Sequence, residues 1–147
     1  MRRCVALVLV GLVVLVAGCS DGDIEFLEPP AEDVVLRVVT GGTIARDWTM
    51  DELEAEVAFT ELVIEGDLQS GPPFLDVIDA SGVAAWETAE VLGMSEGRVL
   101  EVALDVAAAD VDETWILDVS NRGTLKLAAP DLPRERWVRD VGEIRFP

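Results

Sequence analysis

The chain has 147 residues, half of them hydrophobic, so it can form one folded domain with a real core, and wholesale disorder is excluded. It contains no His, which removes the commonest general base at neutral pH and the commonest metal ligand. The formal net charge of −18 argues against a nucleic-acid partner and against a domain that lies flat on anionic lipid, because both surfaces repel an acidic protein.

The beginning of the chain has the three parts of a secretory signal. Residues 1–3 are short and basic, and residues 5–16 form an apolar run that falls short of the roughly 20 residues needed to span a bilayer. The run ends in Val16-Ala17-Gly18-Cys19, which resembles the bacterial lipobox, where the Cys sulfur is acylated and cleavage makes the Cys the first residue. We therefore expect residues 1–18 to be a lipoprotein signal peptide and Cys19 to be lipidated. An ordinary signal peptide with an incidental Cys is the alternative.

Lipidation at Cys19 predicts where the protein is found and what it contacts. Acyl chains contribute about 0.8 kcal/mol per buried CH₂, so two or three of them form a stable anchor. We expect a lipid-anchored protein of the cell membrane or outer membrane, facing the periplasm or the cell exterior. Its expected partners are membrane lipid, through Cys19, and a protein of the cell envelope. Cys4 leaves with the signal, so the mature domain has no free thiol and no disulfide.

Residues 19–32 are expected to form a lipidated flexible tether, because polar residues, Gly and the pair Pro29-Pro30 make poor core material. The folded domain is then expected over residues 33–147. Without the two basic residues of the signal, nine basic residues face 29 acidic ones, which gives the mature chain a net charge of −20. The simplest reason for such a charge is the solubility of a tethered domain.

Apolar runs that are β-branched or alternate with polar residues predict strands. They lie over residues 34–40, 57–64, 99–106, 115–119 and 137–146. Residues 120–123 predict a hairpin turn before a short strand that contains Leu125 and Leu127. Residues 84–92 fit a strand or a helix equally well.

Two segments predict short helices. Thr49 and Glu52 have the spacing of a capping box, in which each side chain bonds to the other residue's backbone N–H. Residues 74–78 place four apolar side chains on one helical face, and Gly82 suits the end of that helix. The predicted fold class is α+β: β-rich and mixed, with five to seven strands and two or three short helices.

The usual chemical motifs are missing from the sequence. The pair Gly41-Gly42 has neither the spacing nor the Lys of a phosphate-binding loop. Without His or a free thiol, the common nucleophile–base pairs cannot be assembled. An acidic window raises the question of calcium, but it lacks the pattern of an EF-hand loop, and a solvated acidic face is the simpler interpretation. It contains Asp105, Asp110, Asp112 and Glu113.

Several short motifs follow one another in a recognisable order. They are Leu36-Arg37-Val38-Val39-Thr40-Gly41-Gly42, Trp48-Thr49-Met50-Asp51-Glu52-Leu53, Gly71-Pro72-Pro73-Phe74-Leu75-Asp76-Val77-Ile78, Gly123-Thr124-Leu125-Lys126-Leu127 and Arg136-Trp137-Val138-Arg139-Asp140-Val141. Taken together, they resemble the oxidoreductase molybdopterin-binding domain, the sulfite-oxidase-type fold. The resemblance covers most of the mature chain.

The resemblance implies a molybdenum cofactor, which active members hold with a Cys thiolate and with His and Arg side chains. Lys126, Arg136 and Arg139 match basic positions of the family's closing motifs, although pairing with the abundant acids is the simpler interpretation of all three. Because His and a mature-domain Cys are absent, we expect no cofactor and a degenerate, non-catalytic binding or interaction module. A molybdopterin-binding oxidoreductase subunit with a redox partner is the first alternative, and an unrelated structural envelope lipoprotein is the second.

Overall fold

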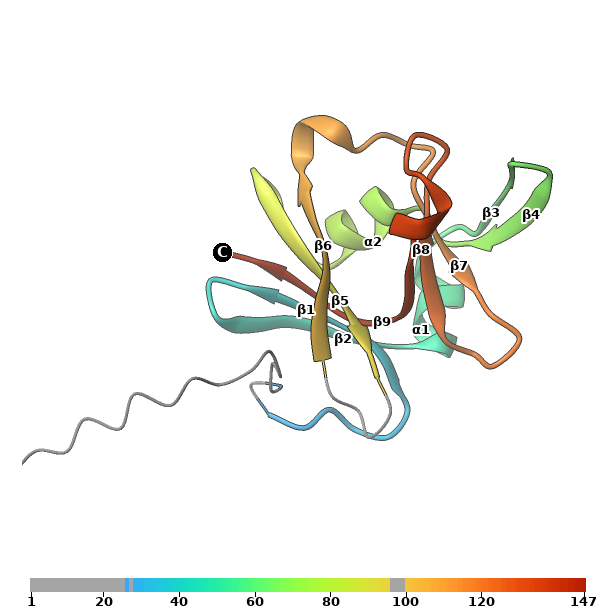
Figure 1. Ribbon diagram of the computed structural model, residues 1–147. Coiled ribbons are helices and arrows are strands. Elements are labelled where there is room, and N and C mark those ends of the chain that lie inside the picture. The colour runs from blue at the N-terminus through green and yellow to red at the C-terminus, as the bar shows by residue number, and fades with distance from the viewer. Residues whose placement is uncertain (1–25, 27, 96–99) are drawn as a thin grey trace, which may run out of the picture.

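The computed structural model describes residue 26 and residues 28–95 and 100–147. These residues form a large mixed sheet, a separate hairpin and two short α-helices (Figure 1), so the predicted β-rich α+β class is confirmed. The large sheet contains β1 (Val34–Thr40), β2 (Thr43–Thr49), β5 (Thr88–Met94), β6 (Leu100–Ala107), β7 (Ile116–Val119), β8 (Leu125–Ala128) and β9 (Val138–Phe146). The hairpin consists of β3 (Thr60–Ile64) and β4 (Asp67–Gly71), and the helices are α1 (Met50–Glu56) and α2 (Phe74–Ala80). Two 3₁₀ turns, η1 (Ala108–Asp110) and η2 (Arg134–Arg136), precede β7 and β9.

The large sheet is organised around β9. Ile144 is the register partner of Val38 on β1 and of Val91 on β5, so these two strands lie along opposite edges of β9. The pairing with β1 is parallel and the pairing with β5 is antiparallel. Earlier in β9, Val141 is the partner of Leu125 on β8, which gives β8 the same edge as β1. The long strand β9 therefore pairs with strands from the beginning, the middle and the last part of the folded domain.

The main core lies between the large sheet and α2, which Figure 1 places between the β5–β6 and β7–β8 pairs. Trp48, at the end of β2, is fully buried, and its indole N–H donates to Ser81 Oγ at 2.9 Å. Ser81 follows α2 directly, and its hydroxyl donates to the carbonyl of Val77 at 2.7 Å. One polar chain thus fixes α2 against β2, inside an apolar cluster that falls entirely within residues 36–146.

The hairpin β3–β4 projects from the β7–β8 side of the molecule (Figure 1). It is joined to β7 by a hydrogen bond from the backbone N–H of Ser70 to Asp118 Oδ1, at 2.7 Å. Gly71 makes the close approach possible, because a Cβ atom there would lie 2.0 Å from the carbonyl oxygen of Leu117. Two apolar side chains of the hairpin, Val63 and Leu68, are exposed and are register partners of each other.

Most predicted elements are found where the sequence placed them. The strands over 34–40, 99–106, 115–119 and 137–146 appear as β1, β6, β7 and β9 with small shifts at their ends. Both helices are present, and the capping box of Thr49 and Glu52 is complete. The ambiguous segment 84–92 overlaps the strand β5, which runs on to Met94.

Three details of the predicted elements were wrong or missing. The strand expected from residue 57 begins at Thr60, because the backbone N–H of Val57 caps α1 by donating to Leu53. β2 and β4 were not predicted. Each lies directly after a turn with positive-φ glycine, Gly42 or Gly66, and forms the return strand of a hairpin. No helix within the described residues is long and apolar enough to cross a membrane.

Candidate functional site

The large sheet has one face on the core and one face that carries charged side chains. Successive side chains along each strand point to opposite faces of the sheet. The core face includes Val38, Val91, Leu104 and Ile144. On the opposite face, which we call the outer face, the register aligns Arg37 with Glu143 on β9, and Arg145 with Glu90 on β5. Glu90 is in turn the register partner of Asp105 on β6. A row of charges therefore crosses the outer face.

A partly buried ion pair lies at one end of the outer face. Arg37 is 1% exposed, and its guanidinium donates to both carboxylate oxygens of Asp47, at 2.6 and 2.7 Å. The hydrogen bond to Asp47 raises the pKa of Arg37, and burial opposes it. The same guanidinium donates to the backbone carbonyl of Glu28 at 2.5 Å. Arg37 thus holds Glu28, which lies in the segment expected to be a tether, against the folded domain.

Glu143 is the most deeply buried acid on this face, with no exposed surface. One of its oxygens accepts a hydrogen bond from Arg145 Nε, while Oε2 has no hydrogen-bond partner. Burial raises the pKa of Glu143, and the neighbouring Arg145 counteracts part of that effect. The positive charge of Arg145 is therefore already matched by a carboxylate behind it.

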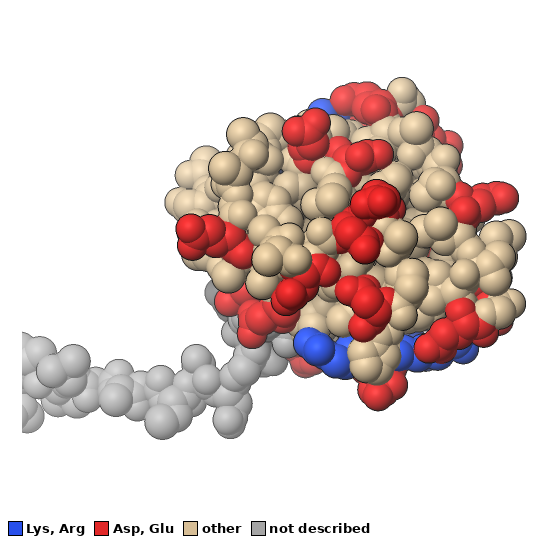
Figure 2. Space-filling model, turned by 90° about the horizontal axis from the view of Figure 1, so that it is seen from above, with Lys and Arg blue, Asp and Glu red and all other residues tan. Residues whose placement is uncertain are grey.

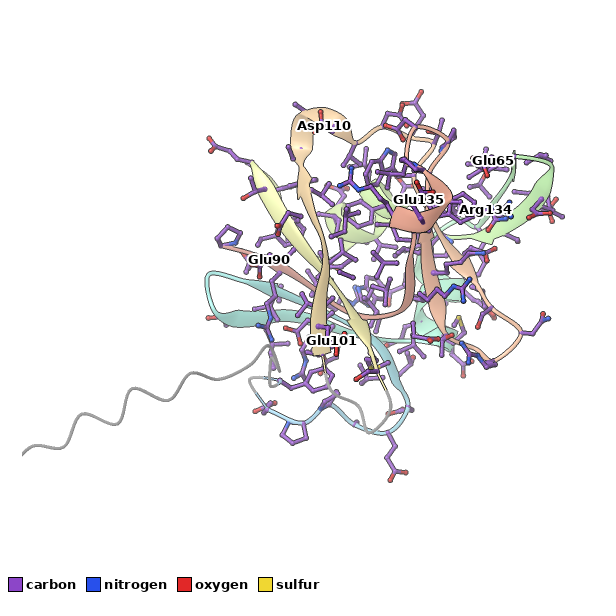
Figure 3. All side chains as sticks on the ribbon, in the orientation of Figure 1. Glu65, Glu90, Glu101, Asp110, Arg134 and Glu135 are labelled. Atoms are coloured by element: carbon purple, nitrogen blue, oxygen red, sulfur yellow. The ribbon has the colours of Figure 1, made fainter. Side chains whose placement is uncertain are left out.

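Next to this pair lies a cleft of about 630 Å³, which we call the outer-face cleft. Its apolar lining includes Val39 of the outer face together with Val106 and Phe146, two core-face residues near the ends of β6 and β9, and its charged lining comprises Arg145, Glu90, Asp105 and Asp110. Figure 3 places Glu90 on β5 and Asp110 beyond the end of β6. Clefts of roughly 300–1,000 Å³ with a mainly apolar lining and a few polar groups are typical small-molecule sites.

A smaller cleft of about 240 Å³ adjoins it and shares Asp105, Val106, Ala107 and Asp110. Trp115 lines this smaller cleft, and its indole N–H is buried without a hydrogen-bond partner. Buried donors without partners are rare in folded proteins.

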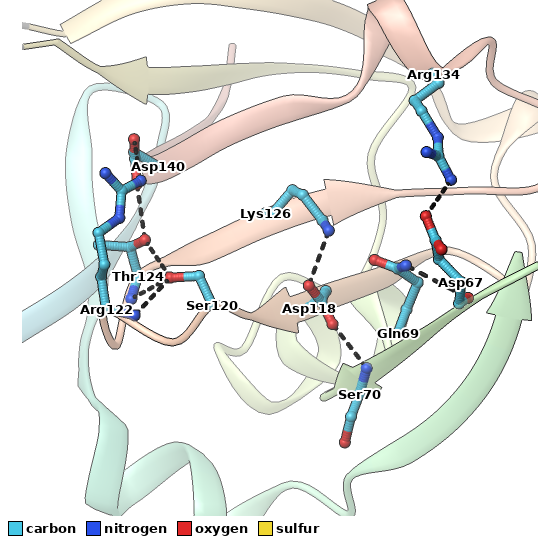
Figure 4. Close-up of polar contacts among 10 residues, drawn as sticks. All are labelled: Asp67, Gln69, Ser70, Asp118, Ser120, Arg122, Thr124, Lys126, Arg134 and Asp140. Atoms are coloured by element: carbon cyan, nitrogen blue, oxygen red, sulfur yellow. Dashed lines mark hydrogen bonds and ion pairs between the residues drawn. The ribbon is translucent and has the colours of Figure 1, made fainter.

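The three basic residues suggested by the resemblance do not come together in either of these two clefts. Lys126 pairs with Asp118 at 3.0 Å (Figure 4), and its ammonium lies 5.4 Å from the ring centre of Trp137. Arg136 is exposed and lines the smaller cleft, and Arg139 is exposed on β9. Of the three, only Arg136 lines either cleft. Cys19 lies outside the described residues, so its lipidation remains a prediction.

These residues do not fit a molybdenum cofactor. The sequence has Cys only at positions 4 and 19, so the domain offers the metal no thiolate, the soft ligand that holds it in the family. An anionic pterin phosphate would meet Lys126 already paired with Asp118, and Arg136 in a cleft that also contains Asp110 and Asp131. Within the described part of the chain, no group of three or more His, Cys, Asp or Glu side chains could hold a metal ion.

Comparison with known proteins adds no assignment: no family model and no curated protein matches the chain. Sequence reasoning had placed Asp105 and Asp110 in an acidic window but had not connected them with Glu90. The missing information was the register between β5 and β6, which no local pattern contains.

Proposed function

We propose that this chain is a lipid-anchored, extracytoplasmic binding module without catalytic activity of its own. The observation that carries the proposal is the lipobox-like tetrad ending in Cys19, followed after a short segment by a folded domain with a ligand-sized cleft. The cleft supplies carboxylates, one guanidinium and apolar side chains, which can bind and orient a molecule. With no His and no thiol in the domain, it lacks the usual proton-transfer and nucleophilic groups.

The contact between Arg37 and Glu28 supports a domain held close to its anchor. Glu28 lies nine positions after Cys19 in the sequence. A fully extended chain spans at most about 3.3–3.6 Å per residue, so this part of the tether reaches roughly 30 Å. A lipid at Cys19 would therefore keep the outer face of the sheet within about 30 Å of the bilayer surface, because Arg37 belongs to that face.

The proposed kinship with the molybdopterin-binding, sulfite-oxidase-type domain rests on the order of the short motifs in the sequence. It is supported by α1 and α2, which occupy two of the matching stretches. The kinship concerns the fold alone, because the donor set of the cofactor is missing. A non-catalytic relative of that family accounts both for the matching order of the motifs and for the missing ligands of the cofactor.

The test of the anchor is a Cys19→Ala variant of the full chain, expressed in a host with a bacterial envelope. We expect the unchanged chain to incorporate labelled palmitate and to sediment with membranes, and the variant to lose both properties. Ser20→Ala is the matched control and should behave like the unchanged chain. Full membrane retention of Cys19→Ala would contradict the anchor. Stoichiometric molybdenum in protein from a molybdenum-replete host would contradict the non-catalytic role.

A further inference from the structure

We propose that the outer-face cleft binds a small organic ammonium ion with an apolar body. This inference rests on the proposed binding function and names the chemistry of its ligand. The cleft combines three carboxylates with apolar walls at a volume suited to a molecule of drug size. Such a lining matches a positive charge joined to a hydrocarbon or aromatic frame.

Two carboxylates of the cleft stand directly opposite each other on neighbouring strands. Glu90 on β5 and Asp105 on β6 are register partners on the same face of the sheet. Residues in this arrangement have Cβ atoms about 4.5–5.5 Å apart, and like charges there destabilise the strand pair. Asp110 adds a third carboxylate to the same cleft. A cation bound between them would remove this repulsion.

The lining of the cleft also includes one positive charge, the guanidinium of Arg145. Arg145 is the register partner of Glu90 and lines the cleft, so it could have neutralised the acids. Its guanidinium is, however, engaged from behind by the buried carboxylate of Glu143. The lining therefore holds three exposed or half-exposed carboxylates against one guanidinium, and the cleft keeps an excess of negative charge whether or not Glu143 is ionised.

The lining of the cleft favours an organic cation over a metal ion. Among residues 28–95 and 100–147, the acidic side chains form no group that could hold a metal. The carboxylates are instead distributed around a cleft whose walls include Val39, Val106 and Phe146. Such apolar walls do not stabilise a hydrated ion. They can bury hydrocarbon, which contributes about 25 cal/mol of binding free energy per Å² of apolar surface removed from water.

The field of the whole molecule favours the same ligand. Figure 2 shows a face on which carboxylates are scattered widely and Lys and Arg gather mainly at one edge. With a net charge of −18, the chain attracts cations and repels anions over distances of about a Debye length.

The experiment compares four probes that share parts of one frame: phenethylammonium, 2-phenylethanol, phenylacetate and ethylammonium. The protein is used as it is recovered from an envelope-bearing host, in nanodiscs of zwitterionic lipid, with empty nanodiscs as the blank. Binding is followed by ligand-observed NMR and by the methyl shifts of Val39, Ala89 and Val106, which line the cleft. We expect phenethylammonium to bind about tenfold more tightly than each of the other three.

Variants locate the site. Glu90→Gln and Asp105→Asn should each weaken phenethylammonium binding by about threefold. Glu101→Gln is the matched control, because Glu101 is an exposed acid at the other end of β6 and does not line the cleft (Figure 3). Equal weakening in all three variants, or equal binding of phenylacetate, would overturn the proposal. Failure of the anchor would be seen only in the Cys19→Ala test, which does not depend on the cleft.

Discussion

Glu143 shows how a single buried side chain can oppose the stability of the fold it belongs to. It has no exposed surface, one oxygen is bound by Arg145, and the other oxygen has no partner. A buried carboxylate in this position favours its protonated form, which is why its pKa is raised above 4.5. Replacement by Gln keeps the shape and an acceptor for Arg145, so this residue can be tested without emptying the site.

The pH dependence of stability follows from the raised pKa. Between 4.5 and the higher pKa of Glu143 in the folded protein, the folded state holds a proton that the unfolded state has lost. The free energy of unfolding therefore falls as the pH rises through this window. We expect a Glu143→Gln variant to lose less stability than the unchanged protein between pH 4.5 and pH 7 in denaturant titrations. Glu101→Gln removes an exposed acid and serves as control, and equal slopes for Glu143→Gln and Glu101→Gln would contradict the expectation.

The elements that the sequence predicted are those whose signals lie within a few residues. The capping box needs only Thr49 and Glu52, and in the structure Thr49 Oγ1 accepts from the backbone N–H of Glu52 while the Glu52 carboxylate accepts from that of Thr49. β2 was missed because Arg46 and Asp47 interrupt its apolar pattern. Both find partners outside the strand: Arg46 pairs with Glu56 at 2.6 Å, and Asp47 pairs with Arg37. Such partners cannot be recognised from the sequence of β2, because they lie on other elements of the fold.

Gly71 is a position where the packing of two elements admits no side chain. A Cβ atom there would lie 2.0 Å from the backbone carbonyl of Leu117, and neither strand can yield easily because β4 is tied to β7 at Ser70. We expect Gly71→Ala to lower the free energy of unfolding by at least about 2 kcal/mol, measured by denaturant titration. Ser70→Ala, one residue earlier in the same strand, should cost less than about 1 kcal/mol. Similar values for the two variants would mean that β4 can move away from β7.

At the scale of the whole molecule, the candidate site depends on strand order, which the sequence did not reveal. Glu90 and Asp105 lie 15 positions apart and meet only because β5 pairs with β6. Arg37 and Glu143 come from opposite ends of the chain and meet because β1 and β9 are parallel neighbours. The composition did predict that the electrostatic potential around the protein is negative, because acidic residues outnumber basic ones. The acids that line the cleft belong to this excess. Charge could be predicted from the sequence, whereas its arrangement could not.

The acidic excess predicts an unusual response to salt. A net charge of −18 makes the folded state repel itself, and screening shortens that repulsion to about 10 Å at 0.1 M ionic strength. We therefore expect the midpoint of thermal unfolding to rise by a few degrees, on the order of 3 °C per kcal/mol gained, between 20 and ~500 mM NaCl. KCl should have the same effect, because screening does not depend on the cation. A fall in the midpoint would instead mean that screening of ion pairs such as Arg134 with Asp67, at 2.6 Å, outweighs the relief of repulsion.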